Sequence, residues 1–242
     1  MHMYTERFYR NWTQSGCLAT FRVVAGESDL QIYAEKDLRR VALSCLVGLR
    51  ERLCSHIALN PLFLRSLTPV RSSSSDPLVR KMEDAGAKWN TGPMAAVAGA
   101  IAQAVGEELL SHSGTVIVEN GGDVWARFPE PLDLLVYPGE ASPLSSGIPF
   151  SVDASQGVSV CTSSGKVGPS FSLGRADSVT AIHPDGAQAD AAATALANRI
   201  RGARDLTGVV ESVAAIRELH GILAVCGESI GIWGGIRLRK EA

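Results

Sequence analysis

Residues 115–128 carry the sequence TVIVENGGDVWARF, in which two apolar stretches flank the turn Asn120-Gly121-Gly122. Apolar and polar positions alternate on both sides of this turn, a period of two that is typical of β-strands. The Asn-Gly pair favours the positive φ angles of a tight hairpin. The stretch therefore predicts two paired strands, at 115–118 and 124–128.

The rest of the chain groups strands and helices in clusters instead of alternating them strictly, which favours an α+β fold over a doubly wound sheet. We expect one domain over residues 1–242, with a loop or linker at 69–77. Further strands are expected as a hairpin within 18–33 and at 132–137, 158–162, 179–182, 222–226 and 230–238. Helices are expected at 37–60, 78–87, 93–110, 187–200 and 207–219.

Composition narrows the class of protein. The formal net charge is -2 over 242 residues, so no basic surface favours nucleic acid or an anionic membrane. No apolar run approaches the roughly 18 residues of a membrane helix. Five scattered cysteines without a metal-binding spacing indicate reduced thiols. We expect a cytoplasmic protein.

The hairpin turn is the first candidate site. Glu119 and Asp123 flank it, and Gly121 and Gly122 leave backbone amides open to a ligand. The strand register decides which of the two carboxylates faces a site. An ordinary hairpin with solvated acids is the alternative.

The second candidate site follows the strand expected at 158–162. Hydroxyls and a glycine at Thr162, Ser163, Ser164 and Gly165, with Lys166 next, provide groups that cradle a phosphate. The run is not a P-loop, because Val167 follows the lysine. A plain surface loop is the alternative.

Asp190 and Thr194 form the third candidate site. Positions i and i+4 share one face of a helix, so a carboxylate and a hydroxyl converge there. Such hard oxygen ligands suit Mg²⁺. Alternatively, Asp190 complements the helix dipole and Thr194 bonds back to a carbonyl group. The helix expected at 93–110 also has a face of small residues, at 95–104. Such a face indicates either tight helix packing or close approach of a ligand.

Taken in order, these three motifs resemble those of the ApbE-type FAD:protein FMN transferases, and more closely a bacterial and archaeal branch related to ApbE. The resemblance implies an ApbE-like α+β fold with mixed or antiparallel sheets and packed helices. It also implies Mg²⁺ held by Asp190 and Thr194, bridging the pyrophosphate of FAD. The residues that would line the FAD or FMN site are Asn120, Gly121, Gly122, Asp123, Thr162, Ser163, Ser164 and Gly165.

One part of the transferase pattern is missing. Transferases carry a histidine in an HI-x-DP-x-TG stretch after the hydroxyl loop, whereas residues 166–177 contain no histidine. The catalytic residues therefore stay unassigned.

Three functions remain open at this point. The chain is a Mg²⁺-dependent protein that binds a flavin or related nucleotide and acts on its pyrophosphate, with an acceptor protein as partner if FMN transfer is retained. Alternatively, it is a non-catalytic flavin carrier or protein-interaction module, or a different enzyme in which Asp177 or Lys166 serves as the acid–base group. The sequence does not indicate an oligomeric state.

Overall fold

The computed structural model describes residues 18–164, 174–216 and 218–239. Its central layer is an eight-stranded sheet in which every neighbouring pair of strands is antiparallel. In sheet order the strands are β1 (Ala19–Ala25), β2 (Ser28–Ala34), β3 (Val116–Asn120), β4 (Asp123–Arg127), β7 (Val158–Ser163), β8 (Ser178–His183), β9 (Gly221–Cys226) and β10 (Ser229–Gly234).

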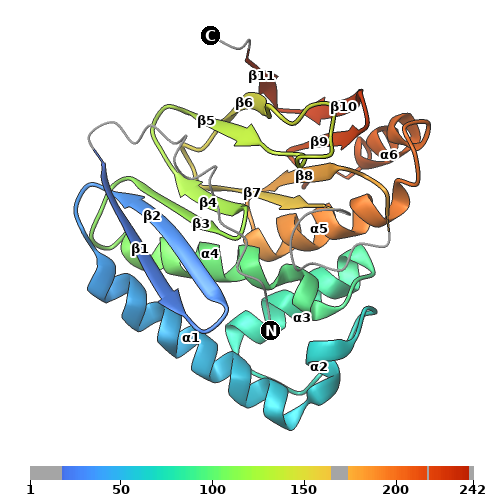
Figure 1. The fold of residues 1–242 in the computed structure, drawn as a ribbon. Coiled ribbons are helices and arrows are strands. Elements are labelled where there is room, and N and C mark those ends of the chain that lie inside the picture. Colours follow the sequence, from blue (N-terminus) through green and yellow to red (C-terminus); the bar gives the residue numbers. More distant parts are fainter. Residues whose placement is uncertain (1–17, 165–173, 217, 240–242) are drawn as a thin grey trace.

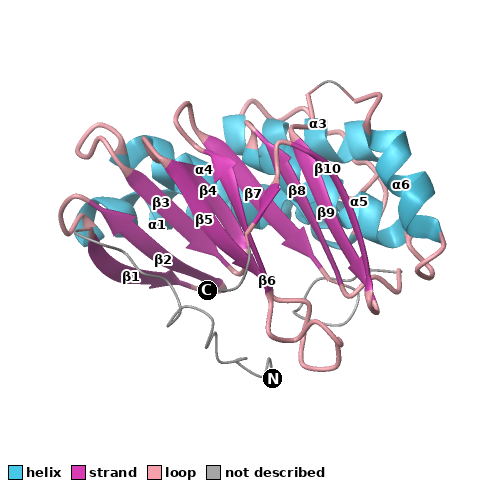
Figure 2. Cartoon of the chain, turned by 90° about the horizontal axis from the view of Figure 1, so that it is seen from above, coloured by secondary structure: helices cyan, strands magenta, loops and turns pink. Residues whose placement is uncertain are grey.

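A smaller sheet lies on one face of this layer, and the helices cover the other face (Figures 1 and 2). The smaller sheet has the order β11 (Arg237–Leu238), β6 (Ile148–Asp153) and β5 (Pro131–Val136). Its apolar side chains, such as Phe150 and Val152, share a core with Val160 and Leu223 of the large sheet. The helices are α1 (Arg39–Leu59), α2 (Pro61–Arg65), α3 (Pro77–Trp89), the 3-10 turn η2 (Pro93–Ala96), α4 (Val97–Leu109), α5 (Gly186–Arg199) and α6 (Asp205–Val213).

The α+β fold class expected from the sequence is confirmed, with differences in individual elements. Strand β6 was not predicted, because Pro149 within it weakens the strand pattern. The helix predicted at 207–219 is wrong at its end: α6 stops at Val213, where Ile216 N donates to Val213 O in a tighter turn. The strand predicted at 230–238 is two strands, since the chain leaves the large sheet after Gly234 and pairs with β6.

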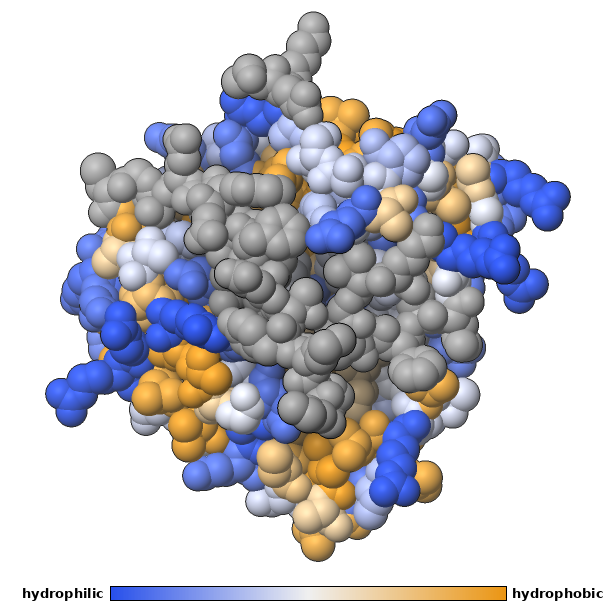
Figure 3. Space-filling view, viewed as in Figure 1, coloured by the Kyte–Doolittle hydropathy of each residue, from blue (hydrophilic) through white to orange (hydrophobic). Residues whose placement is uncertain are grey.

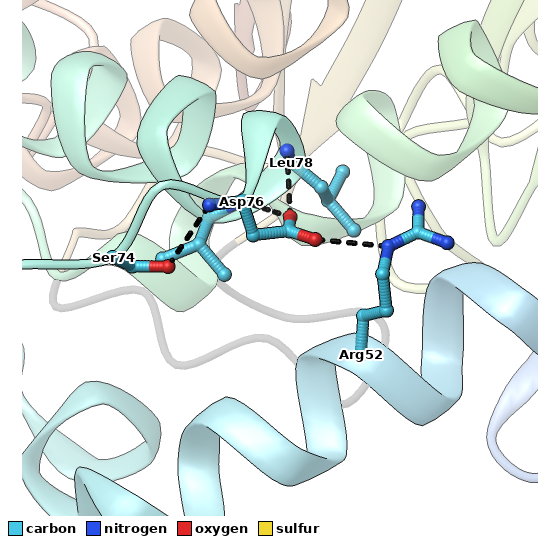
Figure 4. Close-up of polar contacts among 5 residues, drawn as sticks. Arg52, Ser74, Asp76 and Leu78 are labelled. Atoms are coloured by element: carbon cyan, nitrogen blue, oxygen red, sulfur yellow. Dashed lines mark hydrogen bonds and ion pairs between the residues drawn. The ribbon is translucent and has the colours of Figure 1, made fainter.

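Helix α3 is fixed to α1 at the end of the loop predicted at 69–77 (Figure 4). Asp76 is the N-cap of α3: its Oδ1 accepts hydrogen bonds from Leu78 N at 2.9 Å and Val79 N at 3.1 Å. Its Oδ2 accepts from Arg52 Nε of α1 at 2.9 Å. One carboxylate thus satisfies the first amides of α3 and joins two helices.

Helices α4 and α5 meet at two glycines. A Cβ atom built on Gly99 would collide with Gly186 O, and one built on Gly186 would collide with Gly99 O. Only residues without a side chain allow the two backbones to approach this closely. The small-residue face of α4 therefore serves helix packing, the first of the two readings that the sequence left open.

None of the described helices combines the length and the apolar character that a bilayer crossing requires.

The Gly99→Ala substitution should lower the free energy of unfolding by about 1–3 kcal/mol, because the methyl group forces the α4–α5 contact open. Urea titration of wild type and variant measures the change. Gly208→Ala in α6 is the matched control: nothing lies within 4 Å of its added Cβ atom, so it should stabilise the protein by up to about 1 kcal/mol. Equal effects at the two sites would contradict the packing argument.

Candidate functional site

Strand register separates the two acids of the hairpin. Asn120 pairs with Asp123 across β3 and β4, and Glu119 pairs with Val124. Side chains alternate between faces along a strand, so Asp123 lies on the face of Trp125, which packs among the helices. Glu119 lies on the opposite face, where Val124 packs with the smaller sheet. Only Asp123 of this pair therefore points toward the helix layer.

The turn itself has the geometry that Asn-Gly predicts. Gly121 and Gly122 have φ angles of 70° and 103°, which favour glycine. Glu119 Oε1 accepts a hydrogen bond from Gly122 N at 2.7 Å. Glu119 therefore stabilises the turn from the face that Asp123 does not occupy.

Asp190 reaches from α5 to the start of α4. Its Oδ2 accepts hydrogen bonds from Ala98 N at 3.1 Å and Gly99 N at 3.0 Å. These amides belong to the first turn of α4, which has no side-chain cap of its own. Asp190 therefore caps α4 from a neighbouring helix. The sequence suggested that Asp190 complements the dipole of its own helix, whereas in the structure it complements the dipole of α4.

Asp123 and Asp190 lie next to each other beneath the two helices. The two carboxyl groups lie close enough to interact, because the charge of Asp190 raises the pKa of Asp123. Asp123 Oδ1 also accepts from Thr162 N at 2.9 Å. Among the residues that the structure describes, no basic side chain forms an ion pair with either group.

Burial raises the pKa of both carboxyl groups. The pKa of Asp123 lies well above its usual range, first because of burial and second because of the nearby charge of Asp190. Burial raises the pKa of Asp190 to about 7, although the amides of Gly99 and Ala98 favour its charged form. Desolvation therefore outweighs the hydrogen bonds that favour the charged form of Asp190.

Polar side chains from both sides hold the α4–α5 junction in place. Gln103 Oε1 of α4 accepts from Gly186 N, the first residue of α5, at 2.7 Å. Asn120 Nδ2 donates to Ala98 O at 3.1 Å. Each helix thus caps the first turn of the other, and the hairpin is attached to the same point.

Cys161 and Gln103 belong to this site but were not among the site residues predicted from the sequence. Cys161 is buried, and its Sγ lies 3.8 Å from Gly186 O as a donor. Burial, followed by the charges of Asp123 and Asp190, raises the pKa of its thiol well above the usual value. Gln103 was detectable as a lone polar residue inside the apolar run of α4, whereas Cys161 gives no such signal.

The hydroxyl loop is not gathered at the carboxyl pair as a unit. Thr162 reaches the pair through its backbone amide only, while its Oγ1 lies 2.8 Å from Thr180 Oγ1. Ser163 Oγ is buried and has no hydrogen-bond partner within the described residues. Ser164 Oγ donates to Asp177 O at 2.7 Å. Gly165 and Lys166 lie outside the described residues.

Two further candidates occupy different environments. Thr194 follows Asp190 by one turn of α5 and is partly exposed. Its hydroxyl makes no hydrogen bond within the described part of the chain, so the structure leaves it available without placing it at the pair. Asp177 is buried, and its Oδ2 accepts from Gly227 N at 2.8 Å and Ser142 Oγ at 3.4 Å. These contacts give Asp177 a structural role in joining loops.

The carboxyl oxygens of Asp123 and Asp190 fit a hard divalent cation that has few protein ligands. Within the described ranges, no cluster of three or more His, Cys, Asp or Glu side chains is arranged for a metal ion. Two adjacent carboxyl groups without a counter-charge from any described side chain match Mg²⁺, which keeps water or phosphate oxygens in its remaining positions. A cation there would offset the negative charge of the two carboxyl groups.

The carboxyl pair makes stability depend on pH. Asp in the unfolded chain has a pKa of about 3.9, so the folded protein binds more protons than the unfolded chain between pH 4 and pH 7. Stability contributed by the pair is therefore lost as pH rises through this window. Asp123→Asn should raise the free energy of unfolding at pH 8, because the pKa of the buried Asp123 is raised, and change it little at pH 4.5.

Urea titrations at both pH values, without divalent cations, measure this difference. Asp84→Asn is the control, since Asp84 is an exposed acid in a surface ion pair with Arg71. A variant less stable than wild type at pH 8 would contradict the assignment.

Comparison with known proteins places this chain in a family. A protein-family model described as "AbpE bacteria" matches residues 10–216. A UPF0280 protein of Methanothermobacter thermautotrophicus is 38% identical over 232 residues, covering 93% of this chain and 90% of that protein. A UPF0280 protein of Methanopyrus kandleri is 37% identical over 231 residues, covering 89% and 90%.

Solved structures share the fold at low sequence identity. The flavin transferase ApbE from Vibrio cholerae has a TM-score of 0.55 at 12% identity, covering 89% of this chain and 96% of that chain. The ApbE protein of Thermotoga maritima has a TM-score of 0.53 at 16% identity, covering 90% and 97%. The chain therefore belongs to the AbpE bacteria family, together with UPF0280 proteins of archaea, and has the ApbE fold.

Proposed function

We propose that this protein binds a flavin nucleotide together with Mg²⁺ and acts on the pyrophosphate of that nucleotide. The observation that carries the proposal is the buried Asp123–Asp190 pair at the starts of α4 and α5. Two desolvated carboxyl groups with raised pKa values, and with no basic partner among the described residues, are destabilising by themselves. A bound divalent cation removes that cost, which supports a role in ligand binding over one in stability.

The residues that would hold Mg²⁺ are Asp123 and Asp190, with Thr194 supplying a hydroxyl from the next turn of α5. When bound, Mg²⁺ neutralises charge on phosphate oxygens and polarises them. The protein's own contribution is positional: Gln103 and Asn120 fix the first turns of α5 and α4, next to Asp190 of α5 and Asp123 of β4. The positive ends of the two helix dipoles also favour an anionic ligand.

The choice of a flavin nucleotide as the ligand comes from the comparison with known proteins. Structural neighbours are named flavin transferases, which supports a flavin nucleotide as the ligand. Residues 166–177 lack the histidine stretch of those enzymes, so transfer of FMN to a protein acceptor has less support than cleavage or binding of FAD. A non-catalytic flavin carrier is the second candidate, favoured by the same missing stretch.

Asp190→Asn and Asp123→Asn should each weaken Mg²⁺-dependent binding of FAD at least tenfold, about 1.4 kcal/mol, since each removes one anionic ligand. Isothermal titration calorimetry with Mg²⁺ or with a chelator measures the affinity. Glu119→Gln is the matched control: it lies in the same hairpin on the opposite face, keeps an acceptor for Gly122 N, and should bind like wild type. Equal losses in all three variants would count against the carboxyl pair as the metal site.

Incubation of wild type with FAD and Mg²⁺ should release FMN and AMP, and a chelator should stop the release. Chromatography of the nucleotides over time measures both products. Tight Mg²⁺-dependent binding without products would support the carrier. Unchanged FAD with no binding would overturn the proposed ligand.

A further inference from the structure

Gln103 is a buried side-chain amide that lies between two groups with opposite hydrogen-bonding needs. Gly186 N of α5, which can only donate, lies 2.7 Å from Gln103 Oε1. On the other side, Glu107 Oε1 lies 2.7 Å from Gln103 Nε2. An ionised carboxylate can only accept, so Gly186 and Glu107 together determine which end of the Gln103 amide faces α5.

Glu107 connects this buried amide to the surface. Strongly hydrophilic side chains project outward around the edge of the molecule in Figure 3. Glu107 is also exposed, but its carboxylate reaches back by one turn of α4 to Gln103. Within the described residues it forms no ion pair. Its carboxylate is therefore available to Gln103, and a surface residue sets the orientation of a buried one.

The amide of Gly186 depends on this orientation. Gly186 is buried and is the first residue of α5, so its N–H has no partner within its own helix. If the Gln103 amide were turned around, Nε2 would face Gly186 N, and two donors would meet. A buried N–H that loses its acceptor is costly, because no water replaces the lost hydrogen bond. Asp190 follows Gly186 by one turn of the same helix, which lies beside α4 in Figure 1.

We propose that Glu107 is a positioning residue for the carboxyl pair of Asp123 and Asp190. By accepting from Gln103 Nε2, it keeps Gln103 Oε1 directed toward Gly186 N, and that hydrogen bond holds the turn of α5 that precedes Asp190. A cation at position 107 would attract Gln103 Oε1 and withdraw it from α5. The consequence for Mg²⁺ rests on the proposed function, whereas the hydrogen bonds do not.

Hydrogen exchange of the Gly186 amide, followed by NMR on the full chain, reports on the hydrogen bond itself. Glu107→Lys should make this amide exchange at least about tenfold faster, because it loses its acceptor and opens more often. Glu107→Gln keeps an acceptor for Gln103 Nε2 and should retain the protection. Gln103→Glu combined with Glu107→Lys should restore it, since a carboxylate at 103 accepts from both Gly186 N and the new lysine. Faster exchange that this second change does not reverse would overturn the positioning role.

Calorimetric titration of FAD in the presence of Mg²⁺ measures whether the effect reaches the carboxyl pair. Glu107→Lys should weaken the binding at least about fivefold, since Asp190 is less well placed. Glu108→Lys is the matched control: it makes the same charge change at the next exposed residue of α4, but Glu108 lies beside Arg52 of α1, and the variant should bind like wild type. Both lysines lie near the C-terminus of α4, where its dipole favours a cation, so loss of helix stability does not explain a difference between them.

Three outcomes separate the possibilities. Equal losses of binding in Glu107→Lys and Glu108→Lys would reveal a general effect of charge and overturn the proposal. Faster exchange at Gly186 with unchanged binding would show that Glu107 positions α5 but not the carboxyl pair, and would overturn it as well. A wild type that binds no FAD with Mg²⁺ would overturn the proposed function, while the exchange of Gly186 would still decide whether Glu107 orients Gln103.

Discussion

The contact between the first turns of α4 and α5 determines where the other parts of the structure lie. Gly99 and Gly186 bring the two backbones together, and the polar groups around them are exchanged between the helices. Asp190 of α5 satisfies the amides of α4, and Gln103 of α4 satisfies the first amide of α5. Helix ends normally bond to their own cap or to water. Here the end of α4 depends on α5 for its side-chain cap, whereas α5 also has a cap of its own, Asp185, whose side chain accepts from Gln188 N.

This arrangement explains how a carboxyl pair with raised pKa values persists in the core. The amides of Ala98 and Gly99 hold Asp190 in place, and the amide of Thr162 holds Asp123. The surrounding fold therefore holds the carboxyl groups of Asp123 and Asp190 in place although their burial is unfavourable. Such groups are expected at sites that serve ligand binding rather than stability. Asn120 connects the hairpin to the same junction, so the turn is anchored beside the pair.

Local patterns predicted most of the fold. The hairpin at 115–128, the helices that became α1, α3, α4 and α5, and most of the large sheet follow from periodicity and from Asn-Gly or Pro signals. Strand β6 was missed because Pro149 interrupts its pattern, and the end of α6 depends on a turn that periodicity does not report. The α+β class was nevertheless correct, because clustering of elements does not depend on these details.

The candidate site was predicted less completely, because it depends on register and on distant contacts. Asp123 and Asp190 were each identified, but their adjacency and the separation of Glu119 follow from pairings that no local pattern contains. The hydroxyl loop was grouped with them, yet Thr162 turns its side chain to the other face.

The dependence of the site on contacts between distant parts of the sequence has a consequence for folding kinetics. Hairpins such as β1–β2, β3–β4 and β9–β10 join strands that are neighbours in the chain, so their closure costs little entropy. Gly99 and Gly186 lie far apart in the sequence, and their contact must wait until the intervening strands have formed. We therefore expect the carboxyl pair to assemble among the last features during folding, so that a chain competent to bind is a chain that has completed its core.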